Sequence, residues 1–151
     1  MLNKKELKKK YLETMPPMGI YQIRNLSNGK IFIGNSKNLH GKSNSFKFQL
    51  NAGLHVNKAL QDDYTLLGEE NFVFEILDRL EPKEDLSYNY SEDLDTLEEL
   101  WMEKLQPYGE KGYNKPKKWS AEYLIQNSFL KIIINNYDDL FLSNNRSYNI
   151  H

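Results

Sequence analysis

The spacing of hydrophobic and polar residues predicts three short strands. Residues 19–23 and 30–34 are β-prone runs, and the Asn-Gly pair at positions 28 and 29 between them favours the positive φ angles of a tight turn. Residues 71–77 form a third run of the same kind. The pattern therefore predicts a hairpin and one separate strand.

Helical spacing follows the hairpin. Hydrophobic residues recur three or four positions apart over residues 37–51 and 57–67, each ended by a glycine, and again over residues 93–105. Residues 81–92 are polar, and we expect them to form a surface loop. The predicted order of elements is β-β-α-α-β-α.

The two ends of the chain differ in character. Residues 1–17 read as a basic N-terminal lead of one or two helical turns, stopped by two prolines, and residues 18–115 would form the domain. Residues 116–151 are predicted to form a C-terminal helical tail, whose apolar side chains are too many for one narrow stripe. We expect this extra C-terminal helix either to dock on the domain or to make a homodimer.

Composition excludes several kinds of site. A length of 151 residues fits one domain. The chain has no cysteine, so any metal must be held by carboxylate, imidazole or amide groups. No apolar run approaches the length of a membrane span, and no signal-peptide core follows the charged first residues. We therefore expect a cytoplasmic protein with no membrane contact.

Charge is unevenly distributed, although the net charge is only −1. Residues 1–60 carry eleven Lys or Arg and two Glu, whereas residues 61–100 carry two basic residues and fourteen acids. Surface fields are local at physiological salt, so the basic half can attract phosphates while the acidic segment faces elsewhere. The alternative is that both blocks are simply solvated faces.

One carboxylate stands out by its position. Glu98 falls inside the apolar arc of the helix over 93–105, whereas Glu99 and Glu103 fall outside it. A buried acid is unfavourable unless it is paired or binds a cation. Glu98 is thus either a half-exposed side chain at the edge of the stripe or a metal ligand.

The hairpin also carries a pair of motifs. Gly19-Ile20-Tyr21 and, eleven positions after the tyrosine, Phe32-Ile33-Gly34 resemble the paired motifs that name the GIY-YIG nuclease superfamily. The sequence is especially similar to the catalytic domains of phage homing endonucleases. Further similar blocks follow in order at residues 36–39, 53–55, 60–61, 72–77, 98–101 and 112–114. The resemblance implies an α/β fold with a small central antiparallel three-stranded sheet flanked by helices.

This resemblance implies a DNA endonuclease that hydrolyses a phosphodiester with a single divalent ion, Mg²⁺ or Mn²⁺. Tyr21 would accept a proton from the attacking water, provided that positive charge from Lys42 or the metal lowers its pKa. Glu98 would hold the metal. Further members of the site would be His55 and Asn114. The basic face would contact DNA through Lys30, Lys37, Lys42 and Lys47.

Three positions depart from the family pattern. Phe32 stands where a second tyrosine is usual, so a hydroxyl is lost, and Phe46 stands where a histidine is usual. Lys42 replaces an arginine and keeps the charge without the bidentate fork. Two hypotheses follow: a weak or specialised endonuclease, or a catalytically inactive homologue that acts as a DNA-binding or protein-binding competitor or regulator.

Overall fold

The computed structural model describes residues 1–116 of the chain, and its first compact unit is Met1–Lys115. The predicted helix in the tail, and the homodimer that it would make, lie outside the described residues. None of the helices in the described part is long and apolar enough to cross a membrane.

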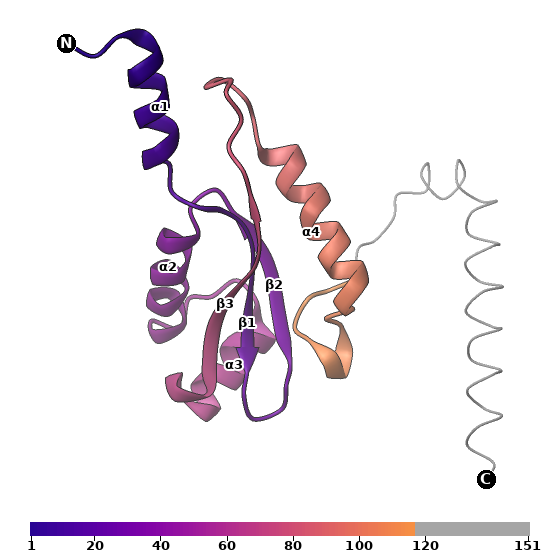
Figure 1. The fold of residues 1–151 in the computed structure, drawn as a ribbon. Coiled ribbons are helices and arrows are strands. Elements are labelled where there is room, and N and C mark those ends of the chain that lie inside the picture. The colour runs from indigo at the N-terminus through magenta and orange to yellow at the C-terminus, as the bar shows by residue number, and fades with distance from the viewer. Residues whose placement is uncertain (117–151) are drawn as a thin grey trace, which may run out of the picture. The chain divides into compact units, whose positions relative to one another are not determined.

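A three-stranded antiparallel sheet lies at the centre, with α2 and α3 on one face and α4 on the other (Figure 1). The strands pair in the order β2-β1-β3, and they are β1 (Met18–Asn25), β2 (Ile31–Ser36) and β3 (Phe72–Leu80). The helices are α1 (Lys4–Thr14), α2 (Leu39–Asn51), α3 (Lys58–Leu67) and α4 (Ser91–Leu105), with 3-10 turns at η1 (Glu69–Asn71) and η2 (Gly109–Lys111). The predicted fold class and the order of its elements from β1 to α4 are confirmed.

The N-terminal helix is longer than expected. Helix α1 has 11 residues, whereas the sequence suggested one or two turns. Its start is fixed by a capping box, in which the side chains of Asn3 and Glu6 each accept a hydrogen bond from the other residue's backbone N–H. No residue of α1 is buried. Local capping, and not packing, therefore sets the start of this helix.

The hairpin register brings the two motifs face to face. Tyr21 pairs with Gly34, and Ile23 pairs with Phe32. Paired residues of an antiparallel ladder point to the same face, so all of these side chains lie on the side covered by α2 and α3. Alternate residues of β2, including Asn35, point to the side covered by α4.

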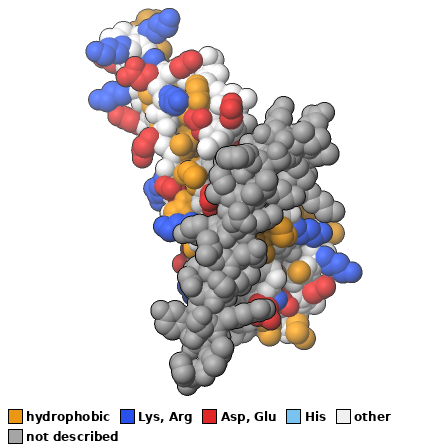
Figure 2. Space-filling model, turned by 90° about the vertical axis from the view of Figure 1, so that its right-hand side faces the viewer, with side chains coloured by type: hydrophobic (Ala, Val, Ile, Leu, Met, Phe, Trp, Pro, Cys, Tyr) orange, Lys and Arg blue, Asp and Glu red, His pale blue; other side chains and the backbone are white. Residues whose placement is uncertain are grey.

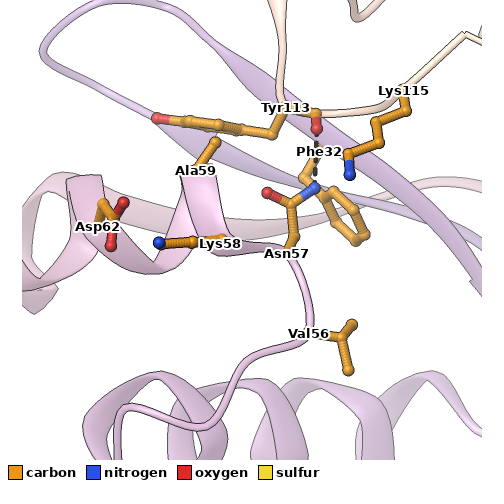
Figure 3. A pocket seen from close by; sticks show the side chains of 8 residues that line it. All are labelled: Phe32, Val56, Asn57, Lys58, Ala59, Asp62, Tyr113 and Lys115. Atoms are coloured by element: carbon orange, nitrogen blue, oxygen red, sulfur yellow. Dashed lines mark hydrogen bonds between the residues drawn. The ribbon is translucent and has the colours of Figure 1, made fainter.

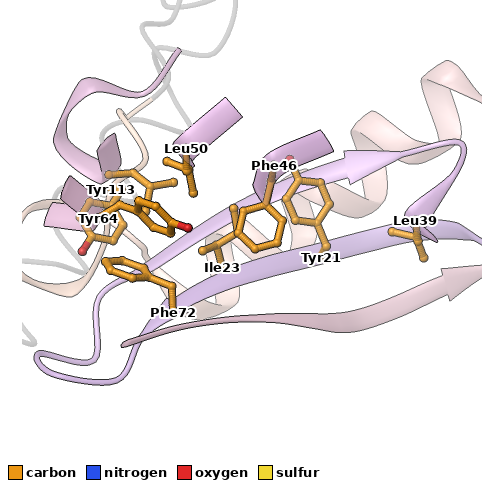
Figure 4. Close-up of a cluster of buried hydrophobic side chains, with 9 residues drawn as sticks. Tyr21, Ile23, Leu39, Phe46, Leu50, Tyr64, Phe72 and Tyr113 are labelled. Carbon is orange, nitrogen blue, oxygen red and sulfur yellow. The ribbon is translucent and has the colours of Figure 1, made fainter. Parts of the chain in front are cut away.

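The main core fills the space between the sheet and helices α2 and α3 (Figure 4). Phe46 is 3% exposed, and its ring stacks on Phe74 with 5.4 Å between centroids. The position where the family has a histidine is therefore a core position in this chain. The buried members of the cluster are Tyr21, Ile23, Leu39, Phe46, Leu50, Leu60, Tyr64, Phe72 and Tyr113.

The segment that follows α4 forms hydrogen bonds to the outer edge of β2. The Tyr113 backbone N–H donates to the Ile31 carbonyl at 2.9 Å. The Asn114 carboxamide accepts from the Ile33 N–H at 2.8 Å and donates to the Ile33 carbonyl at 2.9 Å. An edge strand exposes unpaired backbone groups, and here a side-chain amide satisfies them as a neighbouring strand would.

Gly19 provides a test of how closely β1 and β3 approach. It has φ +156°, and a Cβ at this position would lie 2.0 Å from the Asp78 carbonyl oxygen. We expect Gly19→Ala to lower the free energy of unfolding by more than about 3 kcal/mol, because the backbone must move. Urea unfolding measures this. Gly29→Ala is the control, since Gly29 also has positive φ but nothing lies within 4 Å; a loss of about 1 kcal/mol is expected there. If the two variants lost the same free energy of unfolding, the close approach of β3 to Gly19 would not be what requires a glycine there.

Candidate active site

Tyr21 reaches the edge of the sheet because its neighbour on β2 is a glycine. A Cβ at position 34 would lie 2.5 Å from the Tyr21 hydroxyl oxygen and 2.6 Å from Cζ. The ring thus lies across the backbone of Gly34, with its other side stacked on Phe74 at 5.0 Å. Any side chain at position 34 would displace the phenol from this edge.

The surroundings of Tyr21 hold its phenol in the neutral form. Burial, and secondly the negative charge of Glu98, raise the pKa of Tyr21 well above its ordinary value of 10.0. The Lys42 ammonium lies 5.9 Å from the centre of the ring, yet the pKa is still raised. Lys42 at this distance thus leaves the pKa of Tyr21 above its ordinary value.

Glu98 comes to the site from α4, on the opposite face of the sheet. Its side chain is half-buried, and its Oε2 accepts a hydrogen bond from Asn35 Nδ2 at 2.9 Å. Asp95, one turn earlier in α4, accepts from the same nitrogen at 3.1 Å. The two N–H groups of one amide on β2 therefore orient two carboxylates on α4.

The donors near Glu98 suit one hard divalent cation. Within residues 1–116 there is no cluster of three or more His, Cys, Asp or Glu that would enclose a metal. Mg²⁺ does not need such a cage, because it usually keeps several waters and binds one or two carboxylates together with phosphate oxygens. The half-buried carboxylate of Glu98, held by Asn35 and accompanied by Asp95, fits this mode of binding.

His55 lies on the same side of the sheet as Tyr21 and close to Phe32. Its Nδ1 accepts a hydrogen bond from the Asn57 backbone N–H at 3.0 Å, so the neutral ring carries its proton on Nε2. Burial and the charge of Lys42 lower the pKa of His55. The ring meets that of Phe32 edge to face, with 5.5 Å between centroids. His55 is thus a neutral hydrogen-bond donor next to the substituted motif position.

Asn114 lies next to the motif strand, and both ends of its amide are bound to the backbone of Ile33. With these two bonds it positions β2.

The four lysines assigned to DNA lie on different elements of the fold. Lys42 lies at the site, beside Tyr21 and His55. Lys47 is exposed on α2, about 140° round the helix from Lys42. Lys37 is exposed just before α2, and Lys30 lies 5.7 Å from the centre of the Tyr113 ring. On the face shown in Figure 2, basic and acidic side chains alternate around the end of the molecule that carries α1.

Three features of the site were not predicted, although a weak signal for each is present in the sequence. Asn35 is a polar residue on the covered face of a strand, and Asp95 lies three positions before Glu98, where helical neighbours meet. Gly34 was identified as part of the motif. That its missing side chain makes room for the Tyr21 ring follows only from the pairing of the two strands.

Comparisons with known proteins agree with this fold. A model of the GIY-YIG catalytic domain matches residues 17–114. Because this match covers well over half of the chain, the protein belongs to the GIY-YIG nuclease family. A search among curated proteins found no significant match.

Two solved structures are similar in fold and sequence. The catalytic domain of the homing endonuclease I-TevI aligns with a TM-score of 0.56 and 25% identity, covering 66% of this chain and 99% of that one. A variant of that domain with one glutamate replaced by alanine aligns with a TM-score of 0.54 and 25% identity, covering 69% and 99%. The similarity thus extends over a whole nuclease catalytic domain.

The raised pKa of Tyr21 predicts a loss of stability in alkali. Folding favours the neutral phenol, so this contribution is fully present below about pH 10 and is lost as the pH rises towards the pKa of the folded state. Urea unfolding measures this: between pH 9 and 11, the free energy of unfolding should fall by about 1 kcal/mol more in the wild type than in Tyr21→Phe. Parallel losses in the two proteins would show that folding does not perturb Tyr21.

Proposed function

We propose that the protein is a metal-dependent DNA endonuclease of reduced or specialised activity, which hydrolyses a phosphodiester at the edge of β2. The observation that carries this proposal is the approach of Tyr21 and Glu98 from opposite faces of the sheet. They lie close enough for the carboxylate to raise the pKa of the phenol. A base and a metal ligand converging on one edge are what such hydrolysis needs.

The residues have distinct roles in the proposed reaction. Glu98, oriented by Asn35, would hold one Mg²⁺ or Mn²⁺. Such an ion supplies positive charge that polarises the phosphate and stabilises the leaving oxygen. Tyr21 can accept the proton of the attacking water only as a phenolate, so its own proton must first pass to solvent. A cation held by Glu98 would favour this loss, because it would offset the carboxylate charge that raises the pKa of Tyr21.

Two further groups would bind the phosphate. Lys42 places its ammonium beside the Tyr21 ring, and His55 can donate a hydrogen bond from Nε2. Lys42 acts as a point charge and lacks the fork with which arginine grips two oxygens. Phe32 adds no hydroxyl. These losses support a slow enzyme, since each group of this kind contributes about 10²- to 10³-fold in rate.

A catalytically inactive homologue is the second candidate. It would occupy DNA or bind another protein as a competitor or regulator. The packing of the substituted positions favours it: Phe46 is part of the core, and Phe32 contacts His55 through an apolar ring. Both phenylalanines thus make apolar contacts within the fold. This is expected if the chain no longer depends on the hydroxyl and the imidazole that are usual at these positions.

Removal of the metal ligand tests the first candidate. In a plasmid-nicking assay with Mg²⁺ or Mn²⁺, Glu98→Ala should lower the cleavage rate by about 10²-fold or more. Glu103→Ala is the matched control, because Glu103 is an exposed glutamate on the same helix, and it should cut like the wild type. Nicking that is equal in all three proteins would come from a contaminant and would remove the support for hydrolysis.

Restoring the family residues tests whether the site is impaired or lost. We expect Phe32→Tyr combined with Lys42→Arg to raise the nicking rate by about 10-fold or more, since both return polar contacts to the phosphate. The control pair is Phe48→Tyr with Lys47→Arg; these residues are exposed on α2, and Phe48 is 72% exposed. If the restored protein remained without activity, the inactive homologue would be the better account.

A further inference from the structure

A hollow of about 570 Å³ opens beside Phe32, at the start of α3 (Figure 3). It includes neither Tyr21 nor Glu98, but it adjoins the candidate active site because the Phe32 ring also contacts His55. Its volume is in the range of small-molecule sites in proteins. The residues that line it are Phe32, Val56, Asn57, Lys58, Ala59, Asp62, Tyr113 and Lys115.

Part of the wall of the hollow is apolar, and two of its residues are held by hydrogen bonds. The Tyr113 hydroxyl donates to Asp63 at 2.7 Å and accepts from Asn25 at 2.9 Å, so its ring is fixed in place. The Asn57 amide is also engaged, since it donates to the Tyr113 carbonyl at 2.7 Å and accepts from the Leu60 N–H at 3.0 Å. The apolar surface that the hollow presents is therefore mainly the half-buried Phe32 ring and the Val56 side chain, beside the charged groups that also line it. Val56, which is 92% exposed, forms part of it.

Lysines border this apolar surface on two sides. Lys58 and Lys115 line the hollow, and Figure 3 shows them on opposite sides of Asn57. Lys30 is a third cation nearby, over the Tyr113 ring, whereas Asp62 is the one acid among the lining residues. Aromatic rings next to lysines are the combination with which proteins bind single-stranded nucleic acid: bases stack on the rings while the lysines attract the backbone.

We infer that this hollow binds one unpaired nucleotide of a DNA substrate, next to the phosphodiester that is cut. The base packs against Phe32 and Val56, and Lys58 and Lys115 bind the flanking phosphates. Tyr113 is 5% exposed and forms only the inner wall of the hollow. A paired base has both faces buried in the stack, so it does not reach this surface. The inference rests on the proposed function for the nature of the substrate, and it makes that substrate a DNA with an unpaired nucleotide.

Binding without metal tests this site, because no cleavage then takes place. The probe is a short single-stranded DNA with one 2-aminopurine, whose fluorescence falls when the base stacks, titrated with the full chain in EDTA. Val56→Asp puts a negative charge into the hollow at a position with almost no packing to lose. It should weaken binding about 5- to 100-fold and abolish the fluorescence change.

Leu66→Asp is the matched control: an aliphatic residue on α3, 80% exposed and not part of the hollow, receives the same charge. It should bind like the wild type. The same strand in a full duplex, where the 2-aminopurine is already stacked, should show no change in fluorescence when the protein is added. Equal weakening by both variants, or no weakening by Val56→Asp, would overturn the inference. Because binding is measured without metal, a failure of the nuclease proposal is seen separately, in the nicking assay.

Discussion

The passage of Tyr21 over Gly34 is the contact on which the rest of the site depends. A phenol that starts on the central strand β1 must cross β2 to reach the edge of the sheet, and it does so where β2 has no side chain. The same edge is where Glu98 arrives from the other face, through Asn35. The absence of a Cβ at Gly34 therefore lets the Tyr21 phenol come close enough to Glu98 for the carboxylate charge to raise its pKa.

Strand β2 can serve as this meeting place because it is held from three sides. It pairs with β1, its outer edge is bound by the amide of Asn114, and Asn35 connects it to α4. Two asparagines thus do different work on one strand: one satisfies backbone groups, and the other orients carboxylates. Catalytic geometry of this kind needs such support, since small misplacements of reacting groups reduce rates strongly.

Much of the fold was predictable, and the reasons are local. The Asn-Gly turn, the helical spacing and the capping glycines Gly53 and Gly68 act within a few residues, so the elements from β1 to α4 could be placed from sequence. The position of Glu98 on a half-buried face was also visible as a helical pattern. The hydrogen bond between Asn35 and Glu98 and the bonds from Asn114 to β2 could not be predicted, because each joins residues more than 60 positions apart. The perturbed pKa of Tyr21 likewise arises from burial, which only the packed chain defines.

The central claim is that Glu98 holds a cation at the edge of β2, opposite Tyr21. Crystals soaked in manganese, with data collected for its anomalous signal, test this most directly. The account predicts one peak within bonding distance of a Glu98 carboxylate oxygen, on the side towards Tyr21, and no such peak in Glu98→Ala crystals. If the carboxylate had no bound ion and was turned towards bulk solvent, the scaffold would remain but the hydrolytic site would not.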